Sequence, residues 1–323
     1  MKKNILLLAS LLMLAVSGTA QVVEKCDDPV VVNGHATVTF KRYVVTLLRG
    51  KFSVGDGLQV RFSQGNLQYR AESDTWRFAE NQWDYLGNTG GNATEQAKRA
   101  DQANWIDLFG WGTSGQEVIN EGANPHFQPW DVSGVREDYK PGNRLSVNIA
   151  QGSGYEEADW AYHNKIQNAG NAVHQWWCLS QQQWTFLLNT RDNAASLKGE
   201  GTVHGKNGLI LLPDDWSWAD SEVATAVETA GFTWTAGNSA WANVIPDDLW
   251  TILEKHGAVF LPAAGYRSGV AMYNIGSYGY YWTSTRQDTG WGSAASLRIQ
   301  SNNVYHSNDN RNSGYSVRPV QEY

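Results

Sequence analysis

The chain has 323 residues, and its 32 acidic residues outnumber its 25 basic ones, so its formal net charge at pH 7 is −7. Because no basic cluster offsets that charge, the composition argues against nucleic acid as a partner. The 16 tryptophans indicate either a core built on aromatic rings or surfaces that stack on sugars.

The first twenty residues have the pattern of a secretory signal peptide. A basic start at Lys2 and Lys3 precedes an apolar run from Ile5 to Val16, and small residues lead to Ala20, where we expect cleavage. The apolar run is too short to span a bilayer, and no second run follows. We therefore predict an exported protein without a transmembrane segment, in the periplasm, at the cell surface or secreted.

Residues 21–50 are interpreted as an N-terminal β extension to a domain over residues 51–323. Valine-rich segments surround Asn33-Gly34, a dipeptide typical of hairpin turns. The extension is predicted to be a small hairpin or an added edge on the main sheet. An exported protein can join its two cysteines, Cys26 and Cys178, in a disulfide, and a buried free thiol at Cys178 is an equal alternative.

Three alternating stretches, 59–63, 66–70 and 75–79, predict antiparallel strands in a meander. An aromatic segment, 105–111, follows them. Residues 112–155 show little periodicity and many Gly, Asn and Pro residues, so we predict a long insertion loop. Loops of that length are usually functional or disordered.

Several helices are predicted in the second half. Residues 156–169 begin with acidic side chains, as a helix N-terminus favours, and Gly170 follows them. Ser180 and Gln183 match a capping box, so a second helix is expected there. A short helix is expected over 221–229.

A further helix is expected over 246–256, with Pro246 in its first turn and Gly257 at its end. Two apolar stretches of the same form, 208–213 and 257–262, predict buried strands on either side of these helices.

The last quarter of the chain, Gly257 to Val320, carries the clearest strand pattern. Alternation over 279–285 and 295–300 is typical of half-buried strands. The stretches 274–278 and 301–312 are rich in side chains that hydrogen-bond and stack, and we predict loops there. A rigid sheet that presents Tyr, Trp and Asn on loops indicates a recognition surface.

Five short motifs occur in a single order: Trp177–Trp184, Asn207–Pro213, Leu261–Arg267, Gly279–Thr285 and Gly314–Arg318. Together they resemble the Fibrobacter succinogenes major paralogous domain and its relatives in gut Bacteroidetes, over about Lys51 to Val320. That group is similar to the branch of the C-type lectin-like fold that includes the formylglycine-generating (sulfatase-modifying) family. The resemblance implies an α+β domain with short antiparallel sheets, two or three flanking helices and long irregular loops that carry the ligand site.

The chain departs from this family's pattern in several places. In the helix-opening motif Cys178 replaces an Arg and Gln183 replaces a Glu, so the strand–helix salt bridge is not expected. The cysteine pair of the formylglycine-generating enzymes is missing, and the calcium-binding tripeptides of sugar-binding relatives do not occur. That enzymatic activity and a calcium-clamped sugar site are therefore not expected, and we predict neither cofactor nor metal.

The chain also resembles variable proteins diversified by retroelements, in which scattered aromatic and Asn positions near the C-terminus form the ligand face. By position, the matching residues are Tyr273, Asn274, Tyr278, Tyr281, Arg286, Trp291, Asn303, Tyr305, Asn308 and Asn310. From alternation alone, Tyr280 and Trp282 are expected to be core, whereas Tyr278, Tyr281 and Tyr305 fit surface binding and packing equally well.

The candidates for catalysis are weaker. Adjacent carboxylates at 156–157 and 247–248 fit helix starts, and Asp214-Asp215 is the best acid candidate, although it is also a turn signal. His163 and His174 lie far in the sequence from any Cys or carboxylate at metal-ligand spacing.

The sequence therefore predicts an exported, non-enzymatic recognition protein that binds a protein or glycan ligand on a surface through its C-terminal aromatic and Asn loops. A retroelement-diversified binder is one form that this function takes. Two alternatives stay open: an enzyme acting on polysaccharide, with loop 112–155 as a cleft wall, and a structural surface protein whose fold serves assembly. The oligomeric state is not predicted.

Overall fold

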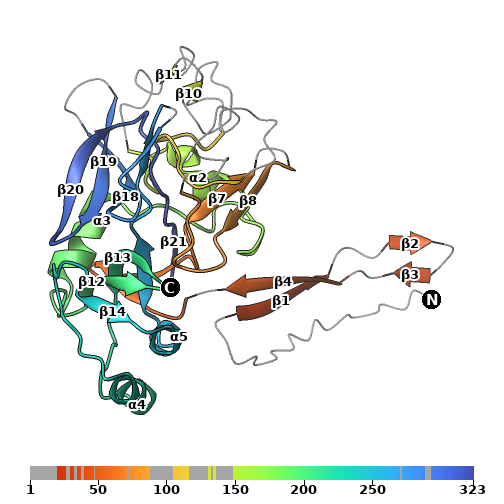
Figure 1. The fold of residues 1–323 in the computed structure, drawn as a ribbon. Coiled ribbons are helices and arrows are strands. Elements are labelled where there is room, and N and C mark those ends of the chain that lie inside the picture. The colour runs from red at the N-terminus through yellow and green to blue at the C-terminus, as the bar shows by residue number, and fades with distance from the viewer. Residues whose placement is uncertain are drawn as a thin grey trace.

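The computed structural model describes residues 20–26, 30–32, 35–37, 40–46, 48–70, 73–87, 105–115, 130–131, 134–135, 148–269, 271–287 and 292–323. They form a mixed α and β structure with several short sheets and few helices (Figure 1). The expected signal peptide before Ala20, most of the loop at 112–155 and Trp291 lie outside the described residues.

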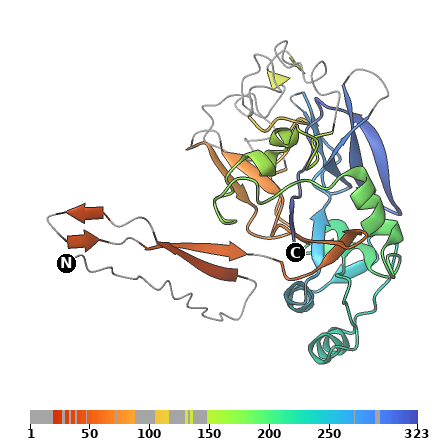
Figure 2. The same cartoon turned by 180° about the vertical axis from the view of Figure 1, so that it is seen from behind.

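A β arm precedes the body of the molecule. It consists of β1 (Ala20–Cys26), β2 (Val30–Val32), β3 (His35–Thr37) and β4 (Phe40–Thr46). β1 pairs with β4 and β2 pairs with β3, both antiparallel. Among the described strands, none of the body pairs with the arm, which reaches away from the body in both views (Figures 1 and 2). The extension is therefore an arm of its own and not an added edge on the main sheet.

Two three-stranded sheets open the body. Their strands are β5 (Phe52–Gly55), β6 (Leu58–Phe62) and β21 (Val320–Glu322) in the order β21-β6-β5, and β7 (Leu67–Arg70), β8 (Thr75–Phe78) and β9 (Trp105–Ile106) in the order β8-β7-β9. The three expected strands exist, but the meander is wrong, because β6 and β7 lie in different sheets. Val320 pairs with Phe62, so the last strand of the chain takes the place beside β6.

The two apolar strands lie side by side in a four-stranded sheet. Its order is β14 (Asn243–Ile245), β12 (Lys198–Val203), β13 (Lys206–Leu211) and β15 (Val259–Pro262). Leu209 of β13 is opposite Leu261 of β15 in antiparallel pairing, whereas β12 and β14 run parallel. In the described part of the long loop, β10 (Trp130–Asp131) pairs with β11 (Gly134–Val135).

The helices are η3 (Glu156–Ala158), α2 (Trp160–His163), α3 (Gln181–Thr185), the π-helix η4 (Phe186–Thr190), α4 (Ser221–Ala230) and α5 (Asp247–Lys255). The capping box of Ser180 and Gln183 is present, as predicted. The continuous helix over 156–169 is wrong. Asp159 has extended backbone, and its buried carboxylate accepts hydrogen bonds from the N–H groups of Ala161 and Cys178, so it ends η3 and caps α2.

The C-terminal sheet has the order β18 (Tyr278–Arg286), β19 (Ser293–Gln300) and β20 (Asn303–Asn310), and β16 (Tyr266–Ser268) pairs with β17 (Ala271–Tyr273) beside it. Two predictions here are wrong. The middle of β18 is buried on both faces, because Tyr280 and Trp282 pack into one core cluster and Tyr281 packs into another, while 314–317 hydrogen-bonds along its edge. The stretch 301–312 is mostly strand, because Asn302 takes the left-handed conformation (φ 65°) that closes a tight turn into β20.

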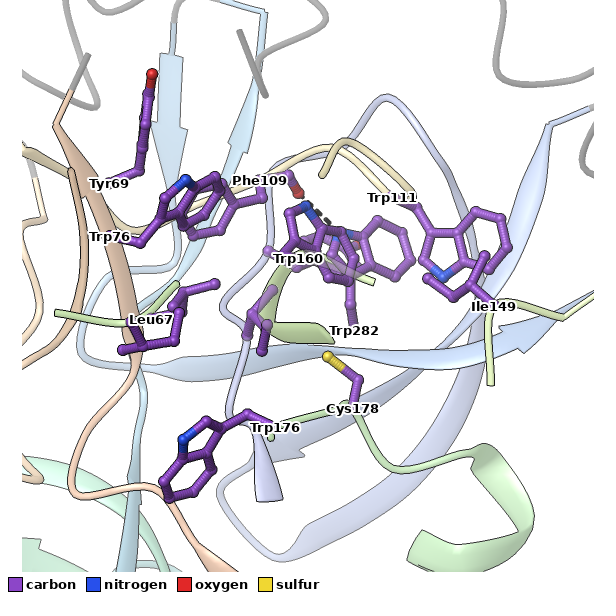
Figure 3. Close-up of a cluster of buried hydrophobic side chains, with 14 of the residues drawn as sticks. Leu67, Tyr69, Trp76, Phe109, Trp111, Ile149, Trp160, Trp176, Cys178 and Trp282 are labelled. Atoms are coloured by element: carbon purple, nitrogen blue, oxygen red, sulfur yellow. Dashed lines mark hydrogen bonds between the residues drawn. The ribbon is translucent and has the colours of Figure 1, made fainter. Parts of the chain in front are cut away.

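Aromatic rings fill the core beside this sheet (Figure 3). This buried aromatic cluster contains Trp76, Phe109, Trp111, Trp160, Trp176, Trp282 and Tyr315. The indole N–H of Trp111 donates to the carbonyl of Thr283 at 2.7 Å, and that of Trp282 donates to the carbonyl of Phe109 at 2.7 Å. The rings of Trp111 and Trp282 therefore bury apolar area while their N–H groups keep a hydrogen-bond partner. The prediction that Tyr280 and Trp282 are core is confirmed.

Candidate ligand-binding face

The register of the C-terminal sheet decides which predicted residues share a face. Tyr280 on β18 is opposite Arg298 on β19, which is opposite Tyr305 on β20. Two residues further along, Tyr278 on β18 is opposite Gln300 on β19, which is opposite Asn303 on β20. Side chains two residues apart on a strand point to the same side. The side chains of Tyr278, Tyr280, Arg298, Asn303 and Tyr305 therefore lie on one face, which with Tyr266, Tyr273 and Asn274 we name the tyrosine face.

The β16–β17 hairpin supplies the exposed end of this face. Tyr266 and Tyr273 are opposite each other, and their rings stack with centroids 5.2 Å apart. The ring of Tyr266 also contacts Tyr280 at 4.8 Å. The guanidinium of Arg267 donates to the carbonyl of Gly269 at 2.8 Å and holds the hairpin turn. Tyr273, with 46 % of its surface exposed, is thus held by a braced hairpin.

Asn274 fixes the start of β18. Its backbone is left-handed (φ 58°), a conformation that Asn tolerates better than most residues, and its side-chain amide donates to the Tyr280 hydroxyl at 3.0 Å. Its carbonyl accepts from the N–H of Tyr278 at 3.0 Å. Asn274 itself is exposed. It therefore positions two tyrosines and still presents polar atoms to solvent.

The stack continues from the surface into the core. Tyr278 stacks on Tyr280 at 5.8 Å, Tyr280 contacts Tyr315 at 4.9 Å, and Tyr315 stacks on Trp282 at 4.3 Å. Exposure falls along this path, from Tyr278, half-buried, to Trp282, which is 2 % exposed. Rings held in this way lose little conformational freedom when a ligand binds.

Arg298 supplies the charged group of the face. Its guanidinium lies over the Tyr280 ring at 5.3 Å and forms an ion pair with the buried Asp309, which also accepts from Ser296. Burial acts to lower the pKa of Arg298, but the hydrogen bonds and charge of Asp309 raise it above its ordinary value. Because the two charges compensate each other, the face offers donors without a large net charge.

Tyr281 does not belong to this face, and its prediction as a ligand-binding residue is wrong. It is fully buried on the other side of β18, where its hydroxyl donates to the carbonyl of Pro262 at 2.8 Å and accepts from Asn66 at 3.4 Å. Burial raises the pKa of this hydroxyl above its ordinary value. It is a packing residue because the alternation that exposes Tyr278 turns Tyr281 inward.

The other predicted residues are dispersed. Asn308 and Asn310 are exposed, but they alternate to the side of β20 opposite Tyr305. Arg286 lies at the far end of β18, where its N–H donates to Asn148. Of the ten predicted residues, the structure therefore brings together Tyr273, Asn274, Tyr278, Asn303 and Tyr305.

Sequence reasoning missed Tyr266 and Arg298. Tyr266 lies inside one of the family motifs, so the motif carried a signal that was read as structural only. Arg298 alternates away from the apolar side of its strand, but only the register places it beside Tyr280.

The best acid candidate, Asp214, is occupied by packing contacts. One carboxylate oxygen accepts from both the N–H and the hydroxyl of Ser53 at 2.7 Å, and the other accepts from the buried Arg191 at 2.8 Å. Asp215 is exposed in the following turn. Asp214 thus links β5 to the segment that follows β13, so the role of Asp214 here is structural.

Glu157 bonds two histidines. His163 and His174 each place a ring nitrogen 2.7 Å from one of its carboxylate oxygens, although the sequence shows no metal-ligand spacing around them. Burial acts to raise the pKa of Glu157, but these hydrogen bonds lower it below its ordinary value. Within the described residues, no three His, Cys, Asp or Glu side chains are placed to hold a metal ion.

Cys178 carries a free thiol, buried beside Asp159, and burial raises the pKa of that thiol well above its ordinary value. None of the helices in the described part of the chain is long and apolar enough to cross a bilayer.

A family model described as a domain of unknown function (DUF8237) matches residues 220–320. The match runs from the N-cap of α4 to the first residue of β21 and contains every residue of the tyrosine face. No curated protein matches the chain at a significant level, and neither does any solved structure.

Proposed function

We propose that this protein is an exported, non-enzymatic recognition protein whose tyrosine face binds a protein ligand on a surface. The observation that carries the proposal is the stack that runs from Trp282 in the core to Tyr273 on the surface. Tyrosine and arginine are the side chains that dominate binding energy at protein interfaces. Here they come from separate elements and are already fixed in place.

A protein ligand suits this face better than a glycan. Sugars stack on open ring faces, whereas Tyr266 and Tyr280 have neighbouring rings against theirs. The surface therefore offers ring edges, hydroxyls and the amides of Asn274 and Asn303, a composition close to that of antibody binding sites.

The fold that we propose for the body is C-type lectin-like, with the major paralogous domain as its nearest form. The support is the five ordered motifs, which the structure brings into contact: Arg267 bonds Gly314, Tyr280 bonds Ser316, and Trp177 bonds Val320 next to the last motif. An experimental structure whose body does not superpose on a C-type lectin-like domain would reject this assignment.

The proposed function is tested by changing two tyrosines of the face. The labelled protein is applied to an array of extracellular proteins and to an array of neutral and acidic glycans. The variant Tyr273→Ala/Tyr305→Ala is expected to lose at least about tenfold in affinity for any protein captured, because it removes the outermost rings.

The matched control is Tyr155→Ala/Tyr323→Ala, which removes two exposed tyrosines elsewhere on the molecule. It is expected to bind as the parent does. Equal binding by the face variant and the parent contradicts the assignment of the face. Capture of glycans alone, lost in the face variant, keeps the face but overturns the class of ligand.

A further inference from the structure

The outer edge of β20 is open in the part of the chain that the structure describes. β20 has eight residues and is the last strand of its sheet. Outside its pairing with β19, its backbone makes one described backbone hydrogen bond, from the N–H of Ser313 to the carbonyl of Asn310. The far edge of β18 differs, because Trp282 and Ser316 bond across it.

The devices that usually protect an edge strand are largely absent from β20. Its sequence, NVYHSNDN, contains neither Lys nor Pro. Its register with β19 runs unbroken from Asn303 to Asn310, so no bulge twists it away. Its one charged carboxylate, Asp309, is neutralised by Arg298. An exposed edge of this length is a template for another strand.

The β arm lacks a third strand beside its main ladder in the part of the chain that the structure describes. Its longest ladder pairs the seven residues of β1 with the seven of β4 and joins no other described strand. A two-stranded ladder alone is marginally stable in water, so the arm gains stability from a third strand.

The arm and β20 of one molecule do not meet. Both views draw the arm on the side of the body away from β20 (Figures 1 and 2). Residues 20–46 carry three acidic side chains (Glu24, Asp27, Asp28) and three basic ones (Lys25, Lys41, Arg42), so charge does not oppose pairing with the neutral edge of β20.

We propose that the β arm of one copy adds to the edge of β20 of a second copy, by main-chain hydrogen bonding of the kind seen in strand addition. The contact joins two different surfaces. Such a head-to-tail contact builds open chains unless its rotation closes a ring. The tyrosine face remains free, because strand addition uses the edge of β20 and not its face.

Two full-length variants test the two halves of the contact. Val22→Pro/Val44→Pro breaks the arm, since these residues pair in its ladder and proline removes a ladder donor. Asn308→Lys/Asn310→Lys blocks the edge at two exposed positions whose side chains lie on the side of β20 opposite the tyrosine face. The control, Gln182→Lys/Asn238→Lys, adds the same charge at exposed positions elsewhere.

Molar mass is measured by light scattering over a wide range of concentration, with thermal unfolding as the check of folding. The parent and the control are expected to grow in mass with concentration, and each of the two variants is expected to stay at the mass of one chain. Mixed one to one, the edge-blocked and arm-broken variants are expected to form a species of two chains, because each retains the half that the other lacks.

Four outcomes overturn the proposal. The parent stays monomeric throughout; the edge-blocked variant still associates, so that the arm pairs with itself; the arm-broken variant still associates, so that β20 pairs with itself; or the mixture stays monomeric. None of them bears on ligand capture by the tyrosine face, so the two proposals stand or fall separately.

Discussion

The buried aromatic cluster and the tyrosine face are two ends of one stack of rings. They differ in whether the polar atoms of their rings are bonded inside the protein or exposed to solvent. In the cluster, Trp111, Trp176 and Trp282 donate their indole N–H groups to backbone carbonyls. On the face, Tyr273 is 46 % exposed and its ring rests on one neighbour. A ring whose N–H is matched to one carbonyl is difficult to replace, whereas a ring at the surface can be exchanged with little effect on folding.

This difference is why the outer end of the stack suits recognition. The inner rings hold Tyr280, and Tyr280 holds Tyr278 and Tyr266, so the outer positions inherit rigidity without contributing much to it. Side chains that are fixed but dispensable for folding are free to be selected for binding.

The largest expected effect lies at the inner end. Trp282→Ala should lower the free energy of unfolding by about 4 kcal/mol, because it opens a cavity beside Tyr315 and leaves the carbonyl of Phe109 without its donor. Tyr273→Ala should lower it by less than about 1 kcal/mol. Chemical denaturation of both variants measures the contrast, and equal losses would show that the stack is uniformly structural.

The strands of this region could be predicted because their apolar alternation is local, and so could the capping box of Ser180 and Gln183. The failures have non-local causes. The helix over 156–169 breaks at Asp159 because a carboxylate is needed by Cys178, nineteen positions on. The sequence predicts a loop over 301–312, because the polar residues there give no strand pattern, and the strand β20 forms by pairing with β19.

An intermediate effect is expected at Asp159, next to the buried cluster. Burial raises the pKa of its carboxyl from 3.8 to about 6, against the opposing hydrogen bonds from Cys178 and Ala161. The folded state therefore holds this proton more tightly than the unfolded state. The stability tied to the protonated carboxyl is fully present below about pH 3.8 and is lost as the pH rises through about 6.

Asp159→Asn, which cannot ionise, tests this dependence. Relative to this variant, the free energy of unfolding of the parent should fall by up to about 3 kcal/mol between pH 4 and pH 7.5, at about 1.4 kcal/mol for each pKa unit by which the folded and unfolded states differ. Unfolding free energies of both proteins at the two pH values give the difference, in which the other titrating groups cancel. A gap that stays constant, or that changes in the opposite direction, would mean that Asp159 is ionised throughout.

The candidate site was predicted in part. Five of the ten residues that the resemblance implies belong to the tyrosine face. Tyr278, Asn303 and Tyr305 do so because they alternate to one side of β18 and β20. Tyr273 and Asn274 do so because Tyr273 stacks on Tyr266, which contacts Tyr280, and Asn274 bonds Tyr280 directly. Tyr281 could not be separated from Tyr278 by composition, since both are tyrosines in one strand. Which of them is exposed depends on what packs on each side, and that is decided by β15 and the segment 314–317.

The smallest expected effect, a single hydroxyl, separates the two sides of this strand most sharply. Tyr281→Phe keeps the ring but removes the donor to the carbonyl of Pro262, which lies in the interior, so it should cost about 1 kcal/mol of stability. Tyr273→Phe removes a hydroxyl from an exposed ring and should change stability by less than about 0.5 kcal/mol. Binding should respond in the reverse order, because only the Tyr273 hydroxyl is within reach of a ligand. Measured on the same pair of variants, the larger loss of stability should therefore fall on Tyr281→Phe and the larger loss of binding on Tyr273→Phe. Two variants that move both quantities together would mean that the sheet does not divide into a packing side and a recognition side.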